Sequence, residues 1–144
     1  MRKIFLIVLI VAVMGTGGFI FIFYGQKGEA TELNGGRVVE VKENSIIAEG
    51  FVVYSADPAG QREFKKIEFR IVPGTVLTNR VRIITREQAE SGKQFYPTDQ
   101  DKPGRIEDLK SDTGIVSIKS DKDLFKTSKA AATEILYNTY ELPF

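Results

Sequence analysis

The chain contains no cysteine, no histidine and no tryptophan among its 144 residues. Without cysteine it has no disulfide, no thiolate nucleophile and no attachment point for the lipid of a bacterial lipoprotein. Without histidine it also lacks the Ser-His-Asp triad and the usual zinc and haem ligands. These absences exclude the commonest catalytic and metal-binding chemistries. We therefore predict a protein that is not an enzyme and that holds no metal or cofactor.

Net charge is also nearly absent. Lys and Arg total 20, and Asp and Glu total 19. Arg2 and Lys3 precede every acidic residue, so the chain after residue 24 holds 18 basic and 19 acidic side chains. A nearly neutral domain has no overall attraction to polyanions. This disfavours nucleic acid as a partner unless a local basic patch forms, and nothing in the sequence indicates a small-molecule ligand.

An apolar segment spans residues 4–24, where 21 consecutive residues carry no charge. As a helix it would be roughly 30 Å long, which matches the hydrocarbon thickness of a bilayer. Arg2 and Lys3 precede it, so the positive-inside rule places the N-terminus in the cytoplasm. We expect residues 1–24 to form a signal anchor that contacts the membrane through residues 4–24. The rest of the chain would then lie outside the cytoplasm, in the periplasm or at the cell surface.

Cleavage of this segment as a signal peptide is the alternative. Gly28, Glu29 and Ala30 form a small-x-small pattern, and cleavage after Ala30 would give a secreted protein. The apolar region of a signal peptide is usually about 7–15 residues long. The longer run in this chain favours an uncleaved anchor.

The chain after the anchor is predicted to contain a linker and one domain. Residues 25–36 are rich in Gly, Glu and Asn without periodicity, and we expect a flexible linker there. From residue 37 onward, short alternating runs predict strands. The clearest alternation covers residues 64–71, in which Ile67 and Phe69 share one face. Pro73 and Gly74 are expected to end this strand in a turn.

Two further strands are predicted with a specific inward face. In the first strand of the domain, Val39 and Val41 are expected to share that face. In the last strand, residues 129–139, the shared face is expected to contain Ala131, Thr133, Ile135 and Tyr137. Large aromatic residues such as Phe69 and Tyr137 are expected in the core rather than at a cofactor.

A polar segment interrupts the strand pattern at about residues 87–105, where Phe95 and Tyr96 are the large apolar residues. We expect a loop insertion with at most one helical turn. The remaining pattern gives five to six strands within residues 37–144 and no long amphipathic helix. This predicts an all-β fold, and a small OB-like β-barrel is favoured because closure removes exposed strand edges.

Short sequence matches carry a resemblance to a known group. They cover residues 36–41 (Gly-Arg-Val-Val-Glu-Val), 45–48 (Ser-Ile-Ile-Ala), 72–78, 106–110 (Ile-Glu-Asp-Leu-Lys), 114–118 and 131–135. In this order they resemble uncharacterised bacterial membrane-anchored envelope proteins that carry a single small OB-like β-barrel domain of unknown function. The chain departs from the group at residues 111–114, which read Ser-Asp-Thr-Gly where the group has Gly-Asp. The resemblance implies fold and location and transfers no catalytic residues.

The candidate binding site is a basic strand face. Its residues are Arg80, Arg82, Arg86, Lys66 and Arg70. OB-folds bind single-stranded polymers through a basic groove with aromatic platforms, and Phe51, Tyr54, Phe64 or Tyr96 would supply the stacking. Alternating charge is also typical of a strand face that only meets water.

Two weaker patterns resemble chemical sites. Asp99, Asp101 and Gly104 are spaced like the start of a calcium loop, but Pro103 and Lys110 stand where further oxygen ligands are needed. A solvated acidic turn is the simpler interpretation. Ser128 beside Lys129 is an ordinary neighbour pair at this composition.

The sequence thus predicts a membrane-anchored, extracytoplasmic, non-enzymatic binding or assembly module of the cell envelope, with an envelope protein as its partner. The alternative is an OB-type domain that binds a polymer or nucleic acid, either anchored or secreted after signal cleavage.

Overall fold

The computed structural model describes residues 30–53 and 62–144. The elements in order are β1 (Glu32–Val41), β2 (Ser45–Val53), β3 (Arg62–Ile83), α2 (Arg86–Glu90), β4 (Thr98–Pro103), the 3-10 helix η1 (Ile106–Asp108), β5 (Gly114–Ser120) and β6 (Lys129–Glu141). The predicted anchor lies outside the described residues. Within the described ranges, no helix combines the length and apolar character needed to span a bilayer.

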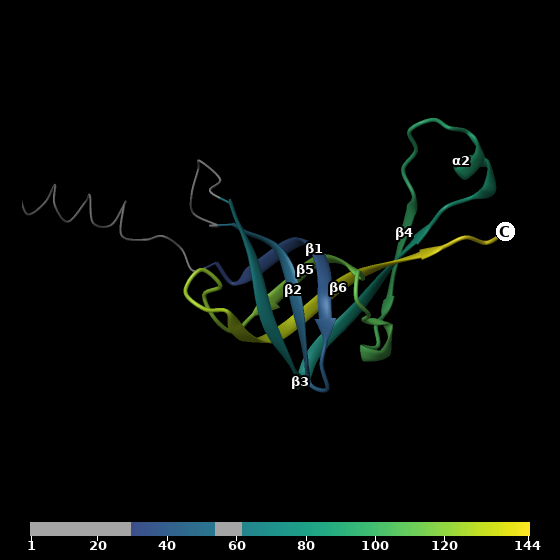
Figure 1. Cartoon of the computed structure of the whole chain (residues 1–144). Coiled ribbons are helices and arrows are strands. Elements are labelled where there is room, and N and C mark those ends of the chain that lie inside the picture. The colour runs from purple at the N-terminus through teal and green to yellow at the C-terminus, as the bar shows by residue number, and fades with distance from the viewer. Residues whose placement is uncertain (1–29, 54–61) are drawn as a thin grey trace, which may run out of the picture.

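Five of the strands close into a barrel, which confirms the predicted all-β barrel (Figure 1). The sheet runs β2-β1-β5-β6-β3, and β2 pairs with β3 to close the ring. The β3–β6 pair is parallel, whereas the other barrel pairs are antiparallel. Strand β4 is additional and pairs with β3 outside the ring.

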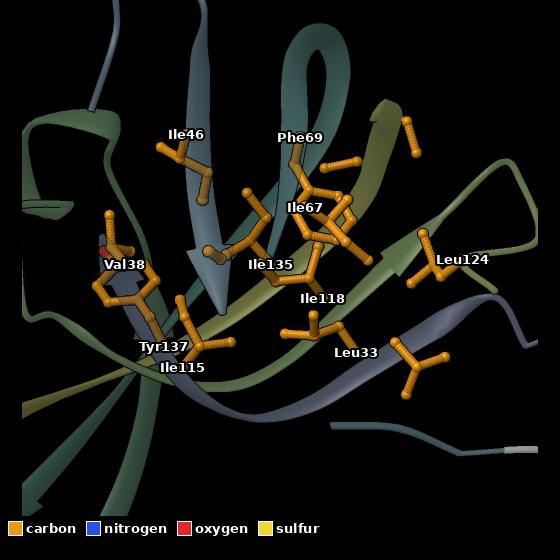
Figure 2. Packing of buried hydrophobic residues seen from close by; sticks show 14 of the residues in the cluster. Leu33, Val38, Ile46, Ile67, Phe69, Ile115, Ile118, Leu124, Ile135 and Tyr137 are labelled. Carbon is orange, nitrogen blue, oxygen red and sulfur yellow. The ribbon is translucent and has the colours of Figure 1, made fainter. Parts of the chain in front are cut away.

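The barrel interior is filled by side chains from all five strands. Figure 2 shows Ile67 and Phe69 of β3 meeting Ile118 of β5 and Ile135 of β6, with Leu33 of β1 beneath them. All five are fully buried. Burial of each such side chain contributes about 1.5–3 kcal/mol, so this cluster is the main source of stability.

The barrel begins earlier in the chain than predicted. Residues 25–36 were expected to be a linker, yet β1 starts at Glu32 and Ala30 is only 2% exposed. The carbonyl of Ala30 accepts a hydrogen bond of 2.8 Å from the Leu124 amide. The glycine-rich composition of this segment reflects a bulge in a strand and not a linker, because Gly36 lies directly opposite Gly50 of β2 beside the register shift. A Cβ at Gly50 would lie 2.7 Å from Leu33 Cδ2 and closer still to the Gly35 carbonyl, so the bulge needs glycine there.

Bulges also shift two of the predicted inward faces. Val38, and not Val39 or Val41, is buried, because β1 has one extra residue relative to β2 between Asn34 and Gly36, which moves the inward face from the odd position of Leu33 to the even position of Val38. In β6 the register with β5 shifts near Thr133 in the same way, which leaves Thr133 exposed. The buried residues of β6 are Ala130, Ala132, Ile135 and Tyr137. One extra residue reverses the alternation of side chains beyond it.

Strand β3 does not end at Pro73 and Gly74, so the predicted turn is wrong. It continues through a bend to Ile83 as one strand of 22 residues. The pairing with β6 is interrupted between Ile71 and Val76. Thr75 bridges this gap, since its hydroxyl accepts from the Val72 amide at 3.0 Å and donates to the Ala132 carbonyl at 2.6 Å. Proline is tolerated because it lies where no ladder hydrogen bond is required of its nitrogen.

The segment 87–105 is not simply a loop. It contains most of α2, whose N-terminus is capped by Thr85 and Gln88, and the whole of β4. All six residues of β4 are exposed. The sequence of this strand therefore lacks the alternating apolar pattern that would predict it. The segment does lie outside the barrel, as an insertion would.

Candidate functional site

The most prominent surface feature is an arm that extends from the barrel (Figure 1). We define the arm as residues 76–103, which contain the second half of β3, α2 and β4, together with residues 134–142, which contain the second half of β6. Residues 76–83 form its central strand, with β4 paired antiparallel on one side and β6 parallel on the other. The arm and the end of β6 lie at the opposite end of the barrel from the 121–128 turn (Figure 1).

Arg80 and Arg82, the centre of the predicted basic face, lie on this arm opposite two acids of β4. Arg80 is aligned with Asp101, and Arg82 with Asp99. The Arg80 guanidinium donates to both carboxylate oxygens of Asp101, at 2.8 and 3.0 Å. The Arg82 Nε to Asp99 Oδ1 distance is 3.6 Å, which is an ion pair without a hydrogen bond. The arm face is therefore a row of paired charges and not a basic stripe.

The titration of Asp101 reflects this pairing. The hydrogen bonds from Arg80 lower the pKa of the Asp101 carboxyl below its ordinary value, and the positive charge of Arg80 adds to the effect. Asp101 in turn raises the pKa of Arg80. Both groups stay ionised at neutral pH, so they neutralise each other.

Arg86 is neutralised locally as well. It lies in the first turn of α2, and its Nε is 2.9 Å from Glu90 Oε1, one helical turn later. Three of the five predicted binding residues are thus engaged with acids. Exposed pairs of this type contribute little to stability, about 0.2–1 kcal/mol each.

Lys66 and Arg70 are on a different part of the molecule. Both lie on the outward face of the barrel half of β3, where they are exposed and form no ion pair within the described residues. Arg70 is opposite Ala131 and Arg80 is opposite Asn138 on β6. Seven strand residues separate these positions, which is roughly 23 Å. The structure therefore does not bring the five predicted residues together.

An aromatic pair lies beside Lys66 on the outward face of the barrel. Phe51 of β2 and Phe64 of β3 are directly opposite each other, and their rings meet edge to face with centroids 5.2 Å apart. They are 44% and 56% exposed. Of the other predicted stacking residues, Tyr96 is 83% exposed on the arm side, and Tyr54 lies outside the described residues.

The junction between barrel and arm is fixed by Tyr137. Its ring is fully buried, and Gly104 packs against it so closely that a Cβ there would lie 2.8 Å from the ring. The hydroxyl donates to Asp108 Oδ2 at 2.6 Å and accepts from the Arg105 amide at 3.0 Å. Burial, assisted by Asp108, raises the pKa of Tyr137 to about 12. This residue is structural, as the sequence predicted.

The weaker candidate sites are occupied by internal contacts. Asp99 and Asp101 face arginines, and no cluster of possible metal ligands occurs in residues 30–53 and 62–144. Lys129, beside Ser128, forms an ion pair of 3.3 Å with Glu68.

Comparison with protein-family models, curated proteins and solved structures finds no match for this chain. The resemblance to membrane-anchored envelope proteins stays a prediction.

Sequence reasoning missed the partner of the basic face. One signal was present: Asp99 and Asp101 have the same two-residue spacing as Arg80 and Arg82. Opposite charges at matching spacing are typical of paired strands. The calcium-loop interpretation of Asp99 and Asp101 does not use this spacing.

Proposed function

We propose that this protein is a membrane-anchored, extracytoplasmic assembly module that is not an enzyme, and that it binds an envelope protein through its arm. The observation that carries the proposal is the arm itself. No residue of the buried core cluster comes from α2 or β4, so the barrel does not need this segment to fill its interior. A projecting segment such as α2 and β4, which adds no residue to the core cluster, is well suited to contact a partner.

The arm offers the kind of surface that protein partners use. Its β4 edge is unpaired on one side within the described residues, and an open edge accepts an added strand. Tyr96 is 83% exposed, Tyr140 is 64% exposed and Leu142 is 56% exposed. Exposed aromatic residues beside satisfied charges are common at protein interfaces.

The OB-like assignment is part of the same proposal. Without β4, the ring order is β1-β2-β3-β6-β5, with a single parallel pair between β3 and β6. This order and the five-stranded closure support an OB-like barrel.

The start of the barrel supports an uncleaved anchor. Ala30 is buried and its carbonyl accepts from the Leu124 amide. Cleavage after Ala30 would remove both this side chain and this acceptor from the barrel, and would leave the Leu124 amide unpaired at a cost of about 1–3 kcal/mol. A chain that is not cleaved after Ala30 avoids that loss.

The polymer-binding alternative receives less support. Arg80 and Arg82 are paired with acids, and Lys66 and Arg70 lie on the barrel rather than beside them. The domain therefore lacks a continuous basic groove of the kind that tracks a phosphate backbone.

Site-directed photo-crosslinking in intact cells tests the proposal. A photoreactive residue is placed at Tyr96 or at Tyr140 of the tagged full chain, and a matched control carries it at Val41, which is 40% exposed on the barrel. We expect one envelope protein to be captured from both arm positions and not from position 41. Capture from no arm position, or equally from all three, would contradict an arm-specific partner. The size of the tagged band reports whether the anchor is retained.

A further inference from the structure

We propose that the barrel end next to Ala30 docks onto the anionic headgroups of the membrane that anchors the chain. This inference rests on the proposed anchor and adds a second contact to it. We call the docking region the tether-end surface, and it contains Phe51, Phe64, Arg62, Lys66, Lys122 and Lys126.

The length of the connecting chain brings this surface close to the membrane. The apolar run ends at residue 24, and Ala30 is fixed in the barrel by burial and by its hydrogen bond from Leu124. Six residues span at most roughly 20 Å even when fully extended. Phe51 lies opposite Asn34, four residues after Ala30, which is about 13 Å along β1. The surface is therefore within reach of the bilayer.

The elements that form the surface meet at one end of the barrel. Strand β1 begins there, β2 ends there, β3 and β6 begin there, and the 121–128 turn closes that end (Figure 1). Lys65 Nζ donates to the carbonyls of Leu124 and Phe125, at 2.7 and 3.0 Å, and so fixes the turn against β3. The Glu68 amide donates to the Ser128 carbonyl, which brings the chain near Lys126 alongside Lys66.

Two acids at this end are engaged by backbone amides, whereas the cations face outward. Asp121 accepts from the Ala131 amide, and Asp123 accepts from the Phe125 amide. The Asp123 side chain is 13% exposed, whereas that of Lys126, its ion-pair partner, is 82% exposed. Lys122, Lys66 and Arg62 are exposed and form no ion pair among the described residues, and Glu63 and Asp121 are exposed acids near them. With Lys126, the exposed cations outnumber these acids, so the outermost charge of the described residues is mainly positive.

The exposed phenylalanine pair gives the surface its apolar component. Phe51 and Phe64 keep about half of their area in water, although they pack edge to face. Aromatic side chains flanked by Lys and Arg are typical of segments that lie in the headgroup region. A headgroup layer covers the rings and also offers phosphates to the cations. Each Lys near an anionic surface contributes about 1 kcal/mol, which corresponds to about a fivefold change in the ratio of docked to undocked protein.

The test uses the absence of tryptophan from the chain. Full-length Phe64→Trp is reconstituted in vesicles of phosphatidylcholine, alone or mixed with phosphatidylglycerol, and quenching by brominated lipid is measured. Tyr96→Trp, on the arm, is the matched control. We expect Trp fluorescence at position 64 to shift to shorter wavelength and to be quenched when phosphatidylglycerol is present, with no change at position 96. If Phe64→Trp loses its cooperative thermal transition, Phe51→Trp replaces it as the sensor.

Charge variants test the electrostatic part. In the Phe64→Trp background, Lys66→Glu with Lys122→Glu should reduce the docked-to-undocked ratio by at least about fivefold per lysine. Lys93→Glu with Lys110→Glu, exposed lysines outside the tether-end surface, should leave quenching unchanged. Equal quenching in the two lipid mixtures, or equal loss in both double variants, would overturn the docking.

The remaining outcomes separate this inference from the proposed function. If the protein resists alkaline carbonate extraction but the residue at position 64 is not quenched, the anchor stands and the docking is wrong. If carbonate releases the protein, the anchor itself is wrong and the docking falls with it. A response to a single-stranded deoxythymidine oligonucleotide in place of lipid would make this surface a polymer site and would also overturn the docking.

Discussion

At the scale of single residues, Tyr137 illustrates how one polar atom holds two parts of the molecule together. Its ring is fully buried in the barrel, and its hydroxyl donates to Asp108 of η1 and accepts from the amide of Arg105, the residue before η1. The turn that leads from β4 back into the barrel is thereby fixed to β6. The buried hydroxyl is costly to desolvate, so its hydrogen bonds must both be present for the arrangement to be stable.

We expect Tyr137→Phe to lower the free energy of unfolding by about 1–3 kcal/mol, because the substitution leaves the Asp108 carboxylate and the Arg105 amide without their shared partner. Urea unfolding at neutral pH measures this loss. Tyr140→Phe is the matched control, since Tyr140 is 64% exposed, and its effect should stay within about 0.5 kcal/mol. Equal effects of the two substitutions would contradict a structural role for the Tyr137 hydroxyl.

The same hydroxyl predicts a dependence on alkaline pH. The pKa of Tyr137 rises from 10.0 to about 12 in the folded protein, mainly through burial. Because the folded pKa is higher, the associated stability is complete below pH 10 and is lost as pH rises through about 12. Two pKa units correspond to about 2.7 kcal/mol. We expect the advantage of the wild-type protein over Tyr137→Phe to shrink by up to this amount from pH 10 to pH 12. A constant difference would show that the phenolate is tolerated in the barrel.

Gly50 shows a second residue-scale constraint, one that comes from backbone crowding. A Cβ there would meet the Gly35 carbonyl and lie 2.7 Å from Leu33 Cδ2. We expect Gly50→Ala to destabilise the barrel by about 1–3 kcal/mol, since neither the strand nor the buried leucine has room to move. Gly74→Ala is the control, because no atom lies within 4 Å of its Cβ position, and it should be neutral or slightly stabilising. Chemical unfolding of both variants decides the matter, and similar values would contradict the crowding argument.

At the scale of elements, the sequence predicts those strands that bury one face. The barrel half of β3 was predicted with its correct inward residues, Ile67 and Phe69, because strict alternation follows from one buried face. Strand β4 was not predictable in this way, since all six of its residues are exposed. The bend at Pro73 was interpreted as a turn because the sequence cannot show that Thr75 supplies the missing hydrogen bonds.

The candidate site was predicted only in part for a related reason. Arg80 and Arg82 do share one strand face, as expected. The sequence does not reveal which strand lies beside them, and the neighbour β4 carries the acids that neutralise them. A local alternation therefore predicts which side chains share a face, whereas the net charge of a surface depends on long-range pairing.

The arm and the barrel are expected to be separable elements. We expect the domain to keep a cooperative thermal transition when residues 84–103 are replaced by a Gly/Ser linker of about eight residues, long enough to cover the roughly 20 Å from Ile83 back to Gly104. No core-cluster residue lies in that segment, so the loss should be small beside the roughly 5–15 kcal/mol stability of a typical domain. Circular dichroism melting measures the outcome.

The same linker in place of residues 121–128 is the control for this replacement. It removes Leu124, which is fully buried, and the carbonyls that accept from Lys65. Loss of such a leucine alone costs about 2–5 kcal/mol. If the arm replacement abolishes the transition while the turn replacement does not, the division into barrel and arm is wrong.

At the scale of the whole molecule, the fold separates its two ends. The end beside Ala30 is close to the proposed anchor, and the arm extends from the opposite end (Figure 1). The proposed membrane contact at the tether-end surface and the proposed partner contact at the arm are therefore compatible with each other. A membrane contact that fixes the orientation of the barrel would direct the arm away from the bilayer. This is the arrangement that an assembly module needs to reach an envelope protein.

This division predicts two classes of backbone dynamics, measurable by native-state hydrogen exchange with mass spectrometry. We expect the amides of β2, β5 and the barrel half of β3 to exchange only through global unfolding, because their strands enclose the buried cluster. Amides in α2 and β4 should exchange through local opening at a much lower free energy, since β4 pairs with a single strand and buries none of its side chains. Residues 76–83 of β3 should fall between these classes, since β6 still pairs with them when β4 detaches.

Denaturant should accelerate exchange of the barrel amides strongly and that of the β4 amides weakly, because local opening exposes little surface. Uniform protection along the whole of β3 and β4 would instead make the arm a rigid part of the barrel and would contradict this division.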